Sequence, residues 1–177
     1  MLHAATLVLS AALLFAVQPM VARMALPLLG GSPAVWNTCM VFFQAMVLAG
    51  YGLAHVFDRR LCTRTQALAY LVLIGVAGMV LPVRVQGGGE AAGEPVRWLL
   101  GALLLHASLP ALALAVSSPL LQRWQAESRS AGRGPYFLYA ASNAGSLAAL
   151  LAYPALLEPL FPLEELARHW TAAYGLW

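Results

Sequence analysis

Five apolar runs, each long enough to cross a lipid bilayer, dominate this chain. An α-helix rises about 1.5 Å per residue, so a run of about twenty residues spans the roughly 30 Å hydrocarbon core of a membrane. Runs of this length predict an all-α fold, a polytopic membrane helix bundle in which each run forms one span. The predicted spans cover residues 4–29, 33–56, 66–85, 96–117 and 136–157.

A sixth apolar segment begins at about residue 168 and reaches the end of the sequence at Trp177. Its residues, RHWTAAYGLW, combine the basic and aromatic side chains that anchor a helix at a membrane interface. The segment is too short to cross the hydrocarbon core. We therefore predict a single transmembrane helical domain over residues 1–177, with five spans and the start of a sixth, truncated inside that sixth helix.

The composition supports the membrane interpretation. Hydrophobic residues make up 61% of the chain and charged residues only 10%, whereas soluble domains carry about 25% charged residues. A cleavable signal peptide is the alternative interpretation of the first run, but no basic segment precedes this run and no clear small-residue cleavage site follows it. The lipid bilayer is thus a predicted partner, and no nucleic-acid partner is predicted.

The arginines between the spans predict the orientation, because cytoplasmic loops of membrane proteins carry an excess of Lys and Arg. Six arginines lie on the side of the N-terminus and four lie on the other side. We therefore place the N-terminus of the chain in the cytoplasm. The first group is Arg59, Arg60, Arg64, Arg123, Arg129 and Arg133, and the second is Arg23, Arg84, Arg97 and Arg168.

Two Ser-Pro sequences predict where helices start. Gly30-Gly31 ends the first span, and Ser32-Pro33 supplies an N-cap residue followed by a proline at the first helical position, where its missing N–H costs nothing. This pattern predicts a tight antiparallel helix pair. The same pattern at Ser117-Ser118-Pro119 predicts a short helix that begins at Pro119 and lies in the inner membrane interface.

Polar side chains inside the predicted spans are the candidate functional residues, because each needs a neighbouring helix or a wet cavity. Gln18 and Pro19 predict either a kinked helix or part of a binding cavity. Arg23 either extends to the lipid headgroups or, on the same face as Pro19, forms an anion site with Trp36 and Asn37 across the hairpin.

The second and fourth spans carry further candidates. Asn37 and Gln44 lie seven residues apart on one stripe of the second span, where they either hydrogen-bond to another helix or face a ligand. His106 lies near the middle of the fourth span. It is either a hydrogen-bonded structural histidine or a group that relays protons or contacts a ligand.

The fifth span has small residues four positions apart, such as Ala141 and Gly145, which predict close packing against another helix. The same span carries a polar stripe at helical spacing, which is also compatible with the wall of a cavity. This stripe consists of Tyr136, Tyr139, Asn143 and Ser146.

The sequence predicts no chemistry within this chain. No Asp or Glu lies inside a predicted span, so neither a carboxylate proton relay nor a charged cation site is expected. No Ser/His/Asp or Cys/His set shares one face, and no Cys or His cluster has metal-ligand spacing. We therefore predict no catalytic residue, no metal site and no cofactor, and we expect that this chain is not itself an enzyme.

Three segments resemble one known family. They are LFAVQPMVARMALPLLGGSPAVWNTCMVFFQAMVLAGYGLAH (14–55), SSPLLQRWQAE (117–127) and PYFLYAASNAGSLAALLAYPALLEP (135–159). Together they look like the N-terminal membrane region of the fused bacterial proteins labelled major-facilitator/spermidine-synthase-like. GYGLAHVFDRR (50–60) also resembles the inner loop between the second and third helices of major-facilitator transporters, which implies part of a six-helix half of that fold.

The resemblance implies that this domain anchors a C-terminal, methyltransferase-like domain of the polyamine aminopropyltransferase type and passes its substrate or product. The full-length protein would then be an aminopropyltransferase-like enzyme. Two alternatives are half of a secondary transporter for a small neutral or anionic solute, completed by further helices, and a structural membrane scaffold. Because Arg23 is positively charged, we do not expect this region to bind spermidine tightly.

Overall fold

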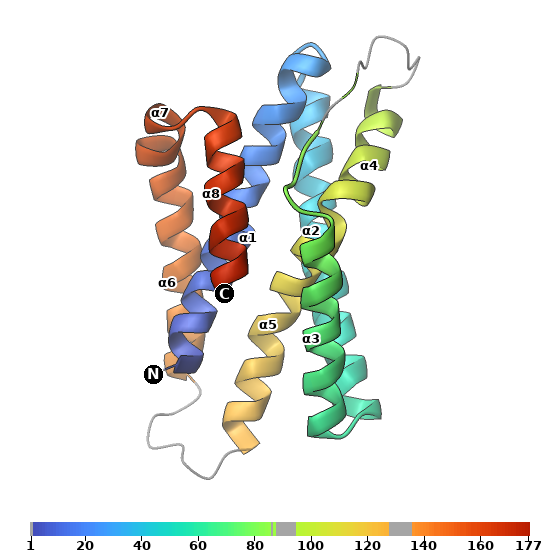
Figure 1. Ribbon diagram of the computed structural model, residues 1–177, viewed down its shortest axis with the longest axis vertical. Coiled ribbons are helices and arrows are strands. Elements are labelled where there is room, and N and C mark those ends of the chain that lie inside the picture. Colours follow the sequence, from blue (N-terminus) through green and yellow to red (C-terminus); the bar gives the residue numbers. More distant parts are fainter. Residues whose placement is uncertain (1, 86, 88–94, 128–135) are drawn as a thin grey trace.

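In the computed structural model the described residues are 2–85, 87, 95–127 and 136–177, and most of them lie in helices (Figure 1). Within these ranges no residue lies in a β-strand, so the predicted all-α fold is confirmed. The longer helices are α1 (Leu2–Ala25), α2 (Pro33–Arg60), α3 (Thr63–Met79), α4 (Pro95–His106), α5 (Ser108–Glu127), α6 (Tyr136–Ala152) and α8 (Leu163–Leu176). Shorter elements are η1 (Leu26–Leu28), the π-helical turn η3 (Tyr153–Leu157) and α7 (Glu158–Leu160).

The helices run alternately along the long axis of the bundle (Figure 1). We call the end that holds the start of α1, the α2–α3 turn and the end of α5 the proximal end. The opposite end, which holds the α1–α2 turn and α7, is the distal end. The most extensive helix contacts are those of α1 with α6 and of α2 with α5.

The predicted count of five spans is not confirmed. Three helical segments are long and apolar enough to cross a membrane, namely His3–Leu28, Pro33–Arg60 and Tyr136–Leu160. The third predicted span, 66–85, forms a helix of only 17 residues that ends at Met79. Proline disfavours a helical conformation of the residue before it, so Pro82 limits this helix at its C-terminal side.

The fourth predicted span is bent. Helices α4 and α5 meet at an angle of 62°. Together they are long and apolar enough for one span only if this bend is ignored. His106 ends α4 and Ser108 begins α5. Pro110 has no N–H to donate to the carbonyl of His106, so the regular helical hydrogen bonding is interrupted at this point.

The prediction of a separate interfacial helix at Pro119 is wrong. Helix α5 continues through Pro119 to Glu127. Leu120 and Leu121 are buried in the bundle rather than exposed at an interface. Ser118, the residue before Pro119, lies inside α5, and its hydroxyl accepts a hydrogen bond from Gln122 Nε2 at 2.9 Å, so it does not cap a new helix.

The predicted hairpin between α1 and α2 is present. Gly30 and Gly31 have φ of 78° and 66°, a left-handed conformation that glycine adopts without strain. Ser32 occupies the N-cap position and Pro33 the first helical position, although the Ser32 side chain makes no capping hydrogen bond.

Helices α1 and α6 approach closely through Gly145, as the small-residue spacing predicts. A Cβ atom added to Gly145 would lie 2.9 Å from the Cα atom of Val8. Helix α8 begins at Leu163, five residues before the predicted start of the sixth span. Trp170 Nε1 donates to the carbonyl of Leu13 at 2.9 Å, which holds α8 against α1.

Candidate ligand-binding cavity

A cavity of about 310 Å³ lies near the distal end, where α1, the start of α2 and the end of α6 meet. We call it the distal cavity. Its polar lining residues are Gln18, Arg23, Trp36, Tyr153 and Glu158, so it brings together three of the residues predicted from the sequence. Its other lining residues are Pro19, Leu26, Met40, Leu150 and Pro154.

Two helices contribute the charged residues of the distal cavity through the same spacing. Arg23 follows Pro19 by four residues in α1, and Glu158, the first residue of α7, follows Pro154 of the turn η3 by four residues. Residues four positions apart share one face of a helix. Helices α1 and α6 pack against each other and run in the same direction, and η3 and α7 follow directly after α6 (Figure 1). This arrangement brings Arg23 and Glu158 together.

Arg23 and Glu158 form a loose ion pair. The distance from Arg23 Nε to Glu158 Oε1 is 3.6 Å, and an Arg23 NH group donates to the Glu158 backbone carbonyl at 3.4 Å. Close charge-assisted hydrogen bonds measure about 2.7–2.9 Å, so neither contact is a tight one. The two side chains stay 36% and 46% exposed, which leaves both charges open to a third group.

Two further polar residues that line the distal cavity have no hydrogen-bond partner among the described residues, and the hydroxyl of one of them, Tyr153, is fully buried. Gln18 is 4% exposed, and its side-chain amide forms no hydrogen bond with any described residue. Tyr153 is also 4% exposed, and its hydroxyl has no hydrogen-bond partner within the described part of the chain. Such groups cost about 1–3 kcal/mol each when nothing satisfies them.

Two carboxylates lie just beyond the ends of the predicted spans. The apolar segment Tyr136–Leu160 includes Glu158, and Pro33–Arg60 includes Asp58. Both lie within two residues of the predicted span ends at 157 and 56, because the helices extend slightly further than the apolar runs do. The Arg23 site is consequently a mixed-charge site and not a purely cationic one.

A second, smaller cavity of about 130 Å³ lies deeper in the bundle between α1, α2, α5 and α6. The predicted residues Asn143 and Ser146 line it. Serines supply most of its other polar groups, and their hydroxyls bond largely to nearby helix carbonyls, as Ser146 Oγ does to Ser142 O at 3.1 Å. These serines are Ser10, Ser117, Ser118 and Ser142.

The remaining sequence candidates line neither of these two cavities. All are exposed on the outside of the bundle, and His106 lies at the bend between α4 and α5. Their polar groups therefore face whatever surrounds the helices rather than one common site. They are Asn37, Gln44, His106, Tyr136 and Tyr139.

Sequence reasoning missed Tyr153 and Glu158. Glu158 could have been found from a repeated spacing, a proline followed four residues later by a charged residue. This spacing occurs as Pro19 and Arg23 in α1 and again as Pro154 and Glu158 after α6. This repeat gains meaning only when the two helices are known to be neighbours. Tyr153 occupies the position before Pro154 that Gln18 occupies before Pro19.

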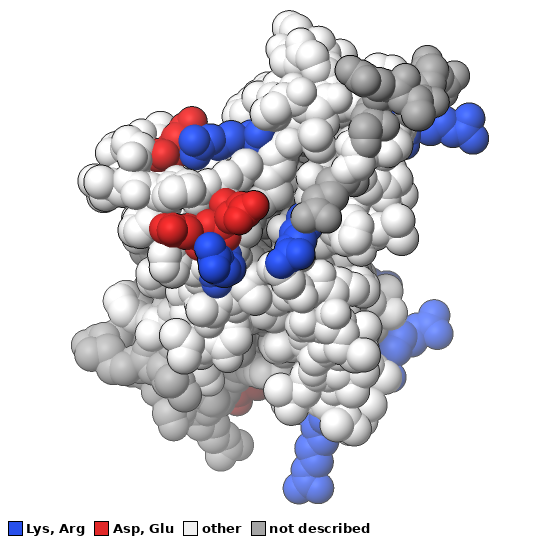
Figure 2. Space-filling model, turned by 45° about the horizontal axis from the view of Figure 1, so that its top comes forward, with Lys and Arg blue, Asp and Glu red and all other residues white. Residues whose placement is uncertain are grey.

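The distal end also carries other charged residues. Figure 2 shows acidic and basic side chains close together at this end, on the side of α7 and α8. A groove of about 470 Å³ there is lined by Arg84, Glu164 and Arg168, together with apolar side chains. All three charged residues are exposed, so this larger groove contains no buried polar group that a ligand would satisfy.

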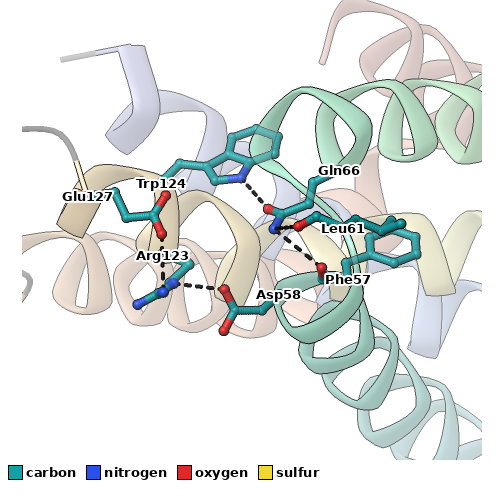
Figure 3. Close-up of polar contacts among 7 residues, drawn as sticks. All are labelled: Phe57, Asp58, Leu61, Gln66, Arg123, Trp124 and Glu127. Carbon is teal, nitrogen blue, oxygen red and sulfur yellow. Dashed lines mark hydrogen bonds and ion pairs between the residues drawn. The ribbon is translucent and has the colours of Figure 1, made fainter.

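A polar network joins α2, α3 and α5 at the proximal end (Figure 3). Gln66 Nε2 donates to the carbonyls of Phe57 and Leu61 at 3.3 and 3.0 Å, and Trp124 Nε1 donates to Gln66 Oε1 at 2.8 Å. Arg123 contacts Asp58 at 2.8 Å and Glu127 at 3.1 Å. The amide of Gln66 is satisfied on both sides, in contrast to that of Gln18.

Comparison with protein-family models, curated proteins and solved structures gives no match. The resemblance to the spermidine-synthase-like fusion proteins therefore stays a prediction. Among the described residues, no group of three or more His, Cys, Asp or Glu side chains is arranged to hold a metal ion.

Proposed function

We propose that this chain is a membrane-embedded helical domain that binds a small polar solute in the distal cavity. The observation that carries the proposal is the hydroxyl of Tyr153, which is buried at the cavity without a hydrogen-bond partner in the described part of the chain. The amide of Gln18, which also lines the cavity, forms no hydrogen bond with a described residue either. A buried polar group is normally satisfied by protein, water or ligand. A polar solute in the cavity would satisfy it.

The size of the distal cavity supports the proposal. Cavities that hold small molecules measure about 300–1,000 Å³ and combine apolar walls with a few polar groups. The distal cavity, at about 310 Å³, suits a solute at the small end of this range. The π-helical turn that carries Tyr153 and Pro154 is a type of irregularity that often accompanies functional sites.

A second proposal follows from the resemblance. The Gln-Pro-x-x-x-Arg sequence and the Gly-Gly-Ser-Pro-x-x-Trp turn, both part of that resemblance, contribute Gln18, Arg23 and Trp36 to one cavity. In this proposal the chain is the membrane domain of a spermidine-synthase-like fusion protein. It anchors an aminopropyltransferase-like domain and passes that domain's substrate or product.

A transporter half remains a further candidate, because the two repeats of a transporter share a site near the bilayer midplane, and the smaller cavity is lined by residues from the middle of α1, α2 and α6. The proposed location is the bacterial inner membrane with the proximal end in the cytoplasm. Support comes from the arginines near the proximal end, namely Arg59, Arg60, Arg64 and Arg123. The two other arginines counted for this side, Arg129 and Arg133, lie outside the described residues.

The proposal is tested on the chain in lipid nanodiscs by thermal unfolding with a set of small solutes: leucine, glutamate, glucose and spermidine. We expect at least one solute to raise the unfolding temperature of the wild-type protein but not that of Gln18→Leu. Gln44→Leu is the matched control, because Gln44 lies on an exposed face and lines neither cavity. If neither a solute nor a phosphatidylethanolamine headgroup stabilises the wild-type protein, or if Gln18→Leu responds as the wild type does, the binding proposal fails.

A further inference from the structure

We infer that the distal cavity takes a zwitterionic solute, a molecule with one acidic group and one amino group. This inference rests on the proposed function and specifies its ligand class. Its basis is the placement of one guanidinium and one carboxylate, Arg23 and Glu158, on the wall of a single cavity with a loose contact of 3.6 Å between them.

The charge balance of the cavity favours a ligand with no net charge. Arg23 and Glu158 together contribute zero net charge at neutral pH, and no other charged residue lines the cavity. A purely anionic or purely cationic ligand would bring an uncompensated charge into a largely apolar site, which is costly. A zwitterion adds no net charge, and each of its ends finds an oppositely charged side chain.

The loose geometry of the Arg23–Glu158 ion pair favours the binding of a zwitterion. A carboxylate of the ligand would accept two hydrogen bonds from the Arg23 guanidinium, and its ammonium group would donate to Glu158. The present contacts at 3.6 and 3.4 Å are longer than charge-assisted hydrogen bonds. Binding would thus replace one loose pair with two close ones.

The remaining walls indicate the rest of the ligand. Met40 and Leu150 provide apolar surface, and Trp36, which is 41% exposed, provides an aromatic face. Gln18 can both donate and accept a hydrogen bond, so it can bind either polar end. These walls suit an amino acid with a small apolar side chain, or the headgroup of a zwitterionic phospholipid that reaches the cavity from the bilayer.

The first arm of the test compares three probes of similar size in phosphatidylglycerol nanodiscs: leucine, N-acetylleucine and leucinamide. At about pH 6.5, below the ~7.7 pKa of an α-amino group, leucine carries both charges. N-acetylleucine then carries only the negative charge, and leucinamide carries only the positive charge. For the wild-type protein we expect leucine to bind about tenfold or more tightly than either blocked probe, a difference of about 1.4 kcal/mol.

The second arm changes the charge of the cavity. Glu158→Gln leaves Arg23 alone, so the preference should shift towards N-acetylleucine, and Arg23→Gln leaves Glu158 alone, so the preference should shift towards leucinamide. Arg123→Gln is the control, because its ion pair lies at the proximal end. If Arg23 and Glu158 only hold α1 against α7, each substitution would weaken the binding of all three probes equally. That result would overturn the inference.

A third arm identifies the source of the zwitterion. If a lipid headgroup is the occupant, adding phosphatidylethanolamine to the nanodiscs stabilises the wild-type protein, but not Arg23→Gln or Glu158→Gln, and free leucine has no effect. If neither leucine nor phosphatidylethanolamine acts, the inference is wrong. If the blocked probes bind as tightly as leucine and Gln18→Leu abolishes their binding, the proposed function stands and only the ligand class is wrong.

Discussion

Arg23 Nε lies 3.6 Å from Glu158 Oε1, although 135 positions separate the two residues in the chain. Each follows a proline by four residues, Arg23 within α1 and Glu158 at the junction of η3 and α7. The pairing converts the cationic site expected from the first helix into a site of mixed charge. It also weakens the charge argument against polyamines, because Glu158 offers an ammonium group a partner beside Arg23.

The Arg23–Glu158 pair should contribute little to folding. Both side chains are more than a third exposed, and exposed ion pairs contribute about 0.2–1 kcal/mol. A double-mutant cycle with Arg23→Ala and Glu158→Ala, measured by unfolding in nanodiscs without ligand, should therefore give a coupling energy in this range. A coupling well above about 2 kcal/mol would identify a mainly structural pair.

Gly145→Ala should destabilise the protein, because the added methyl group would meet the backbone of Val8 in α1. Overpacking of this kind costs about 1–3 kcal/mol. The control is Gly75→Ala in α3, where an added Cβ meets nothing within 4 Å and alanine favours the helix. Unfolding of both variants in nanodiscs measures the difference, and equal stability of the two would contradict close α1–α6 packing.

Gln66→Leu should destabilise the proximal network by about 1–3 kcal/mol, since Trp124 Nε1 loses its acceptor inside the bundle. Adding Trp124→Phe removes the orphaned donor, so the double variant should lose less stability than the sum of the single variants. Gln44→Leu again provides the comparison for an exposed glutamine. Strictly additive losses for Gln66 and Trp124 would argue against their hydrogen bond.

At a pH below the usual pKa of a cysteine thiol, Cys62 should react faster with maleimide than an ordinary cysteine does. It is exposed between α2 and α3, and its hydrogen bond with the Thr65 side chain, 3.2 Å long, lowers the pKa of the thiol. A lower pKa gives more thiolate at a given pH, and the thiolate is the reactive form. Thr65→Val should therefore shift the pH profile of labelling to higher pH, whereas Thr65→Ser should keep it.

The same labelling experiment contains its own check. Cys39 is buried in α2, so Cys62→Ser should leave the folded protein almost unlabelled. An unchanged pH profile in Thr65→Val would show that the hydroxyl has no influence on Cys62.

Local patterns in the sequence predicted several parts of this structure correctly. Gly30-Gly31 and Pro33 predicted the position of the hairpin, because this position depends on the backbone preferences of these residues alone. The small residues of α6 predicted a close helix contact because small side chains alone allow backbones to approach. The sequence also singles out Gln18, Arg23 and Trp36, because polar groups among apolar residues need a partner, and all three line one cavity in the structure.

Other parts depend on which helices become neighbours. Pro119 looks like a helix start in the sequence, but α5 continues through it because Leu120 and Leu121 are buried against other helices. The five polar candidates that line neither cavity match the sequence pattern as well as Gln18 does. Only the direction in which each helix face points separates them from the cavity residues.

The sequence by itself determined that the chain is helical, where its first hairpin turns and that Gln18 and Arg23 are unusual, because these properties follow from local backbone preferences and from the cost of polar groups among apolar ones. Only the tertiary structure decided that Glu158 and Tyr153 complete the distal cavity. Helix α6 lies beside α1 because Gly145 allows their backbones to meet, and this contact brings together two residues that no local pattern could connect.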